Sequence, residues 1–281
     1  MRISFNNQSI FVGNGGVVWR EGLPTLVMLH GAGLNRTVWV LLGRYFARRG
    51  YNVVIPDLPG HGASDGDAFD TIEQNAAWVN ALTQHLTAEY PLAHENVVYC
   101  GHSMGSLVML EAAAQCMAND SNDTNSALRV STVLLLGSAV PMPVGEPLLN
   151  AAKANDHAAI EMINMFGHGY GSRIGNNPIS GINIYNTMEA LLERAKPGVL
   201  FKDLNACNNY TRGQQAAGEL NGKVQATIIA GDADRMTPVR LTRELNATLG
   251  SKLVVLRDCG HMMMSEQPET TLQAMRNALT P

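Results

Sequence analysis

Three residue types that together can activate a nucleophile occur in this sequence in the order serine, aspartate, histidine. Ser103 is the centre of a Gly-x-Ser-x-Gly segment that joins an apolar run to a helix-like stretch. At a sharp turn from strand to helix, small residues two before and two after the centre relieve crowding of the backbone. Such a turn lifts the Ser103 hydroxyl clear of a sheet and places it at the positive end of a helix dipole. The segment therefore predicts a nucleophilic serine.

A candidate acid and a candidate base follow in the second half of the chain. Asp232 and Asp234 come directly after the apolar run 226–230, and His261 comes after the apolar run 252–256. A carboxylate can fix the tautomer of an imidazole and stabilise the imidazolium that forms when the ring takes a proton from serine. Both aspartates satisfy this requirement by position, so the spacing leaves the choice between them open.

The predicted elements that position these residues alternate between strands and helices, which is typical of an α/β domain. Short continuous apolar runs are typical of strands buried on both faces of a parallel sheet, and the longer stretches between them are typical of the covering helices. The runs are 25–29, 52–55, 96–100, 132–136, 226–230 and 252–256. The predicted helices are 37–49, 71–89 with Asp70 as its N-cap, 104–117, and 268–279 with Pro268 in its first turn. Before residue 25, alternating apolar positions at Ile3, Phe5, Ile10 and Val12 predict short antiparallel strands.

The alternation of predicted strands and helices stops between residues 141 and 215. This stretch lacks β-branched runs and contains helix-like pieces at 147–154, 157–166, 186–195 and 198–206. We interpret it as a helical lid inserted into one α/β domain, whose core comprises residues 1–140 and 216–281. The polar clusters at 119–126 and 175–178 predict loops.

Composition excludes several classes of partner. The chain has 281 residues, 46% of them hydrophobic and 16% charged, with a formal net charge of −4. We expect no nucleic-acid partner, because no broad basic field exists to bind phosphates. We also expect no membrane span, because no apolar run approaches the roughly 18 residues that spanning requires. The amino-terminal segment lacks the pattern of a signal peptide, so we expect a cytoplasmic protein, and a homo-oligomer stays open.

Metal and cofactor motifs are not found in the sequence. The four cysteines are Cys100, Cys116, Cys207 and Cys259; they form no Cys-x-x-Cys pair, which predicts packed reduced thiols. His157 and His168 are too far apart for a compact ligand pair, and no Gly-x-Gly-x-x-Gly segment indicates a dinucleotide. We therefore expect neither a metal nor a cofactor.

Five blocks of the chain together resemble the α/β-hydrolase superfamily, and the resemblance covers essentially the whole length. The blocks are 30-HG-31, 57-DLPGHGAS-64, 101-GHSMG-105, 231-GDADRMTP-238 and 260-GH-261. The resemblance implies an α/β-hydrolase fold, with a mostly parallel central sheet flanked by helices and an inserted helical lid.

The resemblance also implies roles for particular residues. It makes Asp234, not Asp232, the acid that orients His261, within the pattern Gly-x-x-Asp-x-x-x-Pro. It implies an oxyanion hole, the pair of amides that binds the developing negative charge, formed by the N–H groups of Met104 and Ala32, with Gly33 as the alternative to Ala32. Structural roles are expected for four further residues, namely His30, Asp57, His61 and His102.

The predicted activity is that of a serine hydrolase cleaving carboxylic esters of small or medium acyl compounds. Lactone, thioester or carbon–carbon bond hydrolysis would use the same three residues, and a non-catalytic binding protein is the alternative of another class. Serine at position 103 argues against the dehalogenase and epoxide hydrolase branches, which use aspartate there. Several of the 14 methionines lie near the candidate site, and we expect some of them to line a deformable acyl pocket.

Overall fold

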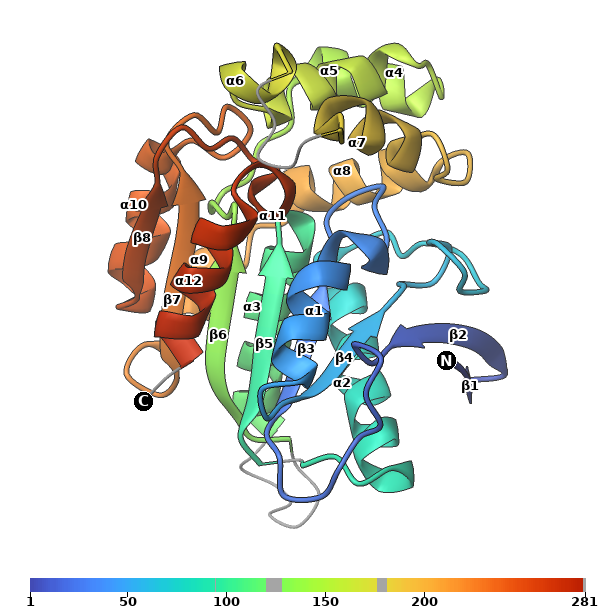
Figure 1. Cartoon of the computed structure of the whole chain (residues 1–281), viewed down its shortest axis with the longest axis vertical. Coiled ribbons are helices and arrows are strands. Elements are labelled where there is room, and N and C mark those ends of the chain that lie inside the picture. The colour runs from blue at the N-terminus through green and yellow to red at the C-terminus, as the bar shows by residue number, and fades with distance from the viewer. Residues whose placement is uncertain (94, 120–127, 176–180, 280–281) are drawn as a thin grey trace.

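The computed structural model describes residues 1–93, 95–119, 128–175 and 181–279. An eight-stranded sheet in the order β1-β2-β4-β3-β5-β6-β7-β8 runs through the molecule (Figure 1). Its strands are β1 (Arg2–Phe5), β2 (Gln8–Gly13), β3 (Thr25–Leu29), β4 (Asn52–Pro56), β5 (Val97–His102), β6 (Val130–Leu136), β7 (Gln225–Gly231) and β8 (Lys252–Leu256). Except for residues 119 and 175, the segments predicted as polar loops, 119–126 and 175–178, lie outside the described residues.

Strands β3 to β8 are parallel, as the six apolar runs predict. Alternate residues of β3 enter different hydrophobic cores: Leu26 and Met28 pack on one face of the sheet, and Val27 and Leu29 pack on the other. A strand with two buried faces has no position for a solvated side chain, which explains the continuous apolar runs.

The amino-terminal strands are antiparallel, again as predicted. Strand β1 pairs with β2, and β2 pairs with β4 in the antiparallel sense. Asn6 and Asn7 join β1 to β2 with φ angles of 50° and 61°. Asparagine adopts this left-handed conformation more readily than most residues, and a two-residue turn with both φ angles positive matches the twist of a hairpin.

Helices cover both faces of the sheet (Figure 1). Residues of α1 and α12 pack with Leu26 in one core, and residues of α2, α3, α9 and α10 pack with Val27 in the other. The helices are η1 (Arg36–Trp39), α1 (Val40–Ala47), α2 (Ile72–Glu89), α3 (Met104–Asn119), α4 (Glu146–Lys153), α5 (Ala158–Gly167), α6 (Tyr170–Arg173), α7 (Ile184–Leu192), α8 (Val199–Asn209), α9 (Gly213–Leu220), α10 (Val239–Leu249), α11 (Met263–Glu266) and α12 (Pro268–Leu279).

Two local predictions need correction. The N-cap of α2 is Thr71 and not Asp70, because Thr71 has the extended backbone of a cap and its hydroxyl accepts from the amide of Gln74 at 3.1 Å. The stretch 37–49, predicted as one helix, is divided into the 3-10 turn η1 and the shorter helix α1, with Asn35 as the cap of η1. Sequence patterns also missed α6, α9, α10 and α11.

Helices α4 to α8 are inserted between β6 and β7 and lie over the carboxyl ends of the strands (Figure 1). Their inner surfaces form a third hydrophobic core with Leu34 and Met262, which belong to loops at that edge of the sheet. Helix α9 crosses the predicted boundary at 215/216 and packs on α3. The division into core and lid remains a prediction. None of the described helices is long and apolar enough to cross a membrane.

The turn after β5 contains glycines that test how closely the backbone packs between β5 and α3. A Cβ atom at Gly101 would lie 2.1 Å from the carbonyl oxygen of Gly105, whereas a Cβ at the helical Gly218 would meet nothing closer than 4.0 Å. We expect Gly101→Ala to lower the free energy of unfolding by at least about 2 kcal/mol, because backbone atoms must move apart. Gly218→Ala should leave it unchanged or raise it by up to about 1 kcal/mol. Urea denaturation measures both; equal stabilities would contradict the expectation.

Candidate active site

The turn that carries Ser103 is a strained connection between β5 and α3. Ser103 has a φ angle of 55°, which is unfavourable for a residue with a side chain, and its amide donates to Leu136 of the neighbouring strand at 2.9 Å. A Cβ at Gly105 would lie 2.5 Å from the carbonyl oxygen of His30. Backbone segments thus approach so closely on both sides of the serine that only glycine fits.

The structure brings His261 and Asp234 together. Nδ1 of His261 lies 2.8 Å from Oδ2 of Asp234, and both side chains are almost fully buried. Asp232 is exposed, and its carboxylate accepts instead from the amide of Cys259 at 3.4 Å. Of the two aspartates that the spacing left open, Asp234 is therefore the one that contacts the imidazole.

Asp234 is held as a carboxylate by a set of donors. Its Oδ1 accepts from the amides of Met236 and Thr237, each at 2.8 Å, and its Oδ2 accepts from the Thr237 hydroxyl at 2.6 Å. Burial alone would raise the pKa of Asp234, but the charge of His261 and the bonds from His261 and Thr237 outweigh it and hold the pKa below its ordinary value. Sequence patterns did not single out Thr237, although it lies within the 231–238 block.

Ser103 and His261 both line one cavity of about 500 Å³ beneath helices α4, α5 and α8. The Nε2 atom of His261 is buried and has no hydrogen-bond partner among the described residues. Ser103 and Nε2 of His261 are therefore not hydrogen-bonded to each other in this structure. Catalytic hydrogen bonds often tighten only when substrate binds, so a buried, unpaired ring nitrogen in the same cavity as a hydroxyl is suited to accept its proton.

The loop after β3 offers the amide of Ala32 to this cavity. Ala32 lines the cavity, and its N–H has no acceptor among the described residues. The amide of Gly33 donates to Asp203 at 2.8 Å and is thus already used. This arrangement favours Ala32 over Gly33 as the second oxyanion donor. Met104, the other expected donor, begins α3 directly after the serine.

Three of the four residues expected to be structural have partners that fit this role. Nδ1 of His30 lies 2.9 Å from the Gly31 carbonyl oxygen, and Nε2 of His102 lies 2.8 Å from the His261 carbonyl oxygen. Burial lowers the pKa of each ring to about 3, so both are neutral. Asp57 accepts from the amides of Arg36 and Ala63. The fourth residue, His61, forms an ion pair with Asp203, a partner that sequence patterns missed.

The cavity wall is mostly apolar. Arg235, whose guanidinium carbon lies 4.7 Å from the ring centre of Phe166, is the only lysine, arginine, aspartate or glutamate among the lining residues. The methionines in the wall are Met142, Met162, Met165, Met236 and Met262. Met104 is buried in the sheet core and does not line the cavity. Flexible thioethers around an apolar space can adapt to different acyl shapes.

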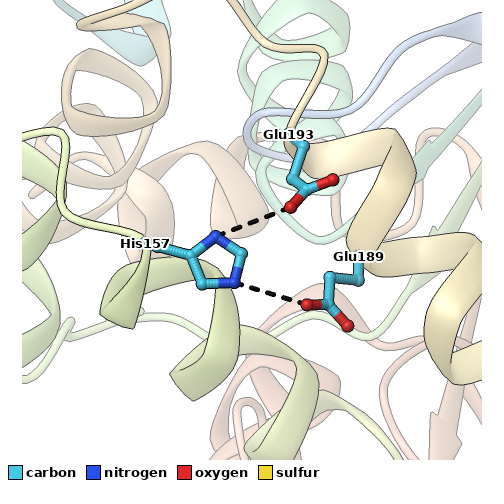
Figure 2. A group of neighbouring side chains, drawn as sticks. All are labelled: His157, Glu189 and Glu193. Atoms are coloured by element: carbon cyan, nitrogen blue, oxygen red, sulfur yellow. Dashed lines mark ion pairs between the residues drawn. The ribbon is translucent and has the colours of Figure 1, made fainter.

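A second polar cluster lies outside this cavity, between α5 and α7. The ring of His157 faces Glu189 with its Nε2 at 3.3 Å and Glu193 with its Nδ1 at 3.6 Å (Figure 2). Because a metal ion binds only one nitrogen of an imidazole ring, these two contacts do not describe three ligands around one point. We interpret the cluster as exposed ion pairs between two helices. His168 is not part of it and lies against Tyr185.

All four cysteines are free and buried, as predicted. Burial raises the pKa of the thiols of Cys100, Cys207 and Cys259 well above the ordinary value. Cys207 lines the cavity but is kept as a neutral thiol. None of these three groups is suited to act as a nucleophile.

The fold and the geometry around Ser103 define the class of α/β hydrolases, and comparisons with known proteins agree. A sequence model of the α/β hydrolase family matches residues 26–274. The chain is 27% identical over 265 residues to the pimeloyl-(acyl-carrier protein) methyl ester esterase of Aromatoleum aromaticum, covering 88% of this chain and 94% of the relative. The structure of an enol-lactonase from Burkholderia xenovorans has a TM-score of 0.80 at 19% identity, covering 100% of both chains.

A further relative is named for a different activity. The chain is 25% identical over 285 residues to the 2-hydroxy-6-oxononadienedioate/2-hydroxy-6-oxononatrienedioate hydrolase of Klebsiella pneumoniae, covering 92% of this chain and 88% of the relative. This protein belongs to the α/β hydrolase family and is a hydrolase.

The donors around Asp234 predict how acid destabilises the protein. Because the pKa of Asp234 is lower in the folded state, its stabilising contribution is present above the unfolded pKa and is lost as the pH falls through the folded pKa. Between about pH 5 and about pH 3, we expect Asp234→Asn to lose less unfolding free energy than the wild type does. Asp232→Asn, at an exposed side chain, should follow the wild type. Denaturant titrations at each pH measure this; parallel curves for Asp234→Asn would contradict it.

Proposed function

We propose that this protein is a serine hydrolase that cleaves carboxylic esters of small to medium acyl compounds. Ser103 attacks the carbonyl carbon, and Nε2 of His261 takes the hydroxyl proton. The amides of Ala32 and Met104 bind the oxyanion of the tetrahedral intermediate. As the intermediate collapses, the bond to the alcohol breaks and His261 returns the proton to the alcohol oxygen. Water, activated by the same ring, then hydrolyses the acyl-enzyme.

The observation that carries this proposal is the orientation of His261. Its Nδ1 is bound to Asp234 at 2.8 Å, which leaves Nε2 as the nitrogen that can accept a proton. The Ser103 hydroxyl lines the same cavity as this ring. A buried carboxylate behind an imidazole stabilises the imidazolium at the moment when the serine becomes a nucleophile.

The cavity supports the substrate class. Its volume of about 500 Å³ lies within the range of small-molecule sites, and its apolar wall favours an acyl group without charge near the reacting carbon. We propose that helices α4 to α8 act as a lid that sets acyl preference. Lactones, thioesters and vinylogous ketones would present a similar carbonyl carbon to Ser103. A cytoplasmic location and a homo-oligomer remain expectations from the sequence.

A fluorophosphonate probe tests the nucleophile directly. We expect stoichiometric labelling of wild-type protein at Ser103, because an activated serine attacks the phosphorus of the probe, expels fluoride and forms a phosphonyl ester. Ser103→Ala should abolish labelling and lower the kcat for p-nitrophenyl butyrate by at least about 1,000-fold. The control is Ser251→Ala, directly before β8, whose hydroxyl donates to Asn246. Folded wild-type protein that neither labels nor hydrolyses any ester, lactone or thioester would exclude the proposal and favour a binding protein.

Chain-length preference tests the acyl pocket. Met142 is buried and lines the cavity, whereas Met188 is similarly buried but is not among the described residues that line it. We expect Met142→Gln to lower kcat/KM for p-nitrophenyl octanoate about tenfold more than for the acetate, because the polar amide meets only the longer acyl chain. Met188→Gln should change both esters alike. An unchanged preference in Met142→Gln would remove this residue from the pocket.

A further inference from the structure

A buried ion pair joins the α4–α8 layer to the loops at the edge of the sheet. Asp203 belongs to α8, and its Oδ2 atom lies 2.8 Å from Nε2 of His61, which follows β4. The two side chains are 1% and 2% exposed. The same oxygen accepts from the amide of Gly33 at 2.8 Å. One atom of the inserted helices therefore holds two loops of the core.

The neighbours of His61 indicate that its ring is an imidazolium. Nδ1 lies 3.0 Å from the carbonyl oxygen of Pro59, which can only accept, and Nε2 faces the carboxylate of Asp203. Both nitrogens must therefore donate. Burial alone would lower the pKa of His61, but the charge and hydrogen bond of Asp203 raise it above the ordinary value. The adjacent ring of His30 is neutral, so it adds no second positive charge.

The 30–34 loop, which carries Ala32, lies against α7 and α8 in addition to its hydrogen bond with Asp203. Gly33 has a φ angle of 66°, and a Cβ there would lie 2.9 Å from Leu200 of α8 and 3.3 Å from Leu192 of α7. Ala32 immediately precedes it, so the direction of the Ala32 amide depends on where the Gly33 amide is fixed. The amide of Gly33 is bound by Asp203 and is directed away from the role of oxyanion donor.

We propose that Asp203 is a positioning residue for the oxyanion hole: from the inserted helices it fixes the Gly33 amide and the His61 ring, and thereby directs the Ala32 N–H toward the reacting carbonyl. The proposal rests on the proposed serine hydrolase function. It implies that the oxyanion hole is complete only while α8 is docked on the loop.

The test is Asp203→Asn in the full-length protein, which keeps the shape of the side chain but removes its charge. We expect the kcat for p-nitrophenyl butyrate to fall about 10- to 100-fold, because small displacements of an oxyanion donor weaken only the transition state. The KM should stay within about threefold of the wild type. The Ki of a trifluoromethyl ketone, whose serine adduct places an oxyanion in the same site, should rise by the same factor as kcat/KM falls.

The control is His157→Gln, which removes the ion pairs between α5 and α7 (Figure 2), whose acidic partners are Glu189 and Glu193. It should keep wild-type kcat and Ki. If Asp203→Asn does not fold, as judged by near-ultraviolet circular dichroism, His61→Gln takes its place. That variant removes the positive charge of the pair, and we expect it to lower kcat and raise Ki in the same proportion.

Three results would overturn the inference. The first is a folded Asp203→Asn enzyme with wild-type kcat and Ki. The second is a kcat loss that His157→Gln reproduces, which would indicate general loosening of the inserted helices. The third is a rise in KM alone, which would place Asp203 in substrate binding. These outcomes require an active wild type that labels at Ser103; a wild type without labelling or turnover would instead end the proposed function, and the inference with it.

Discussion

The close approach of backbone segments around Ser103 is the constraint on which the rest of the structure depends. Gly101 and Gly105 let β5 turn directly into α3 while α3 lies against the carbonyl oxygens that end β3. This contact fixes Ser103 and also fixes where the 30–34 loop leaves the sheet. The Ser103 turn and the 30–34 loop can approach each other in this way only because no side chain separates the two backbones, since a Cβ at Gly31 would lie 3.1 Å from the Cβ of Ser103.

That constraint brings polar groups into an apolar setting, where each requires a partner. Asp234 and Asp203 are buried carboxylates, and each is satisfied by several donors, including an imidazole. An unpaired buried charge would cost several kcal/mol, so each pair can exist only with its elements docked. The small number of charged residues in the chain agrees with this largely buried architecture, because the sheet and the cavity leave few solvated positions.

Local patterns were sufficient to predict the strands of the sheet and to single out Ser103 and His261 as candidate residues, whereas the choice of Asp234 came from the family resemblance. Continuous apolar runs predicted strands with two buried faces, and the small residues around Ser103 predicted the turn from strand to helix. The pairing of Asp203 with His61 was not predictable, because it joins residues 142 positions apart whose contact exists only after α8 docks. The spacing could not separate Asp232 from Asp234 either, because the folded arrangement of the loops after β7 and β8 decides which carboxylate reaches His261. The cap of α2 was misplaced by one residue because Asp70 and Thr71 are both good capping types.

The carboxylate of Asp203 joins α8 to the 30–34 loop through directional hydrogen bonds, which apolar contacts cannot provide. Apolar contacts such as those of Leu192 and Leu200 with Gly33 hold two surfaces together but tolerate sliding. A carboxylate oxygen that accepts from an amide and from an imidazolium fixes the angle as well as the distance. An oxyanion donor must be aimed within a narrow range to favour the transition state over the ground state. Under the proposed role of Asp203, the desolvation cost of the Asp203–His61 pair is explained by precision in the loop and not by stability, since apolar residues of similar volume would stabilise the fold equally well.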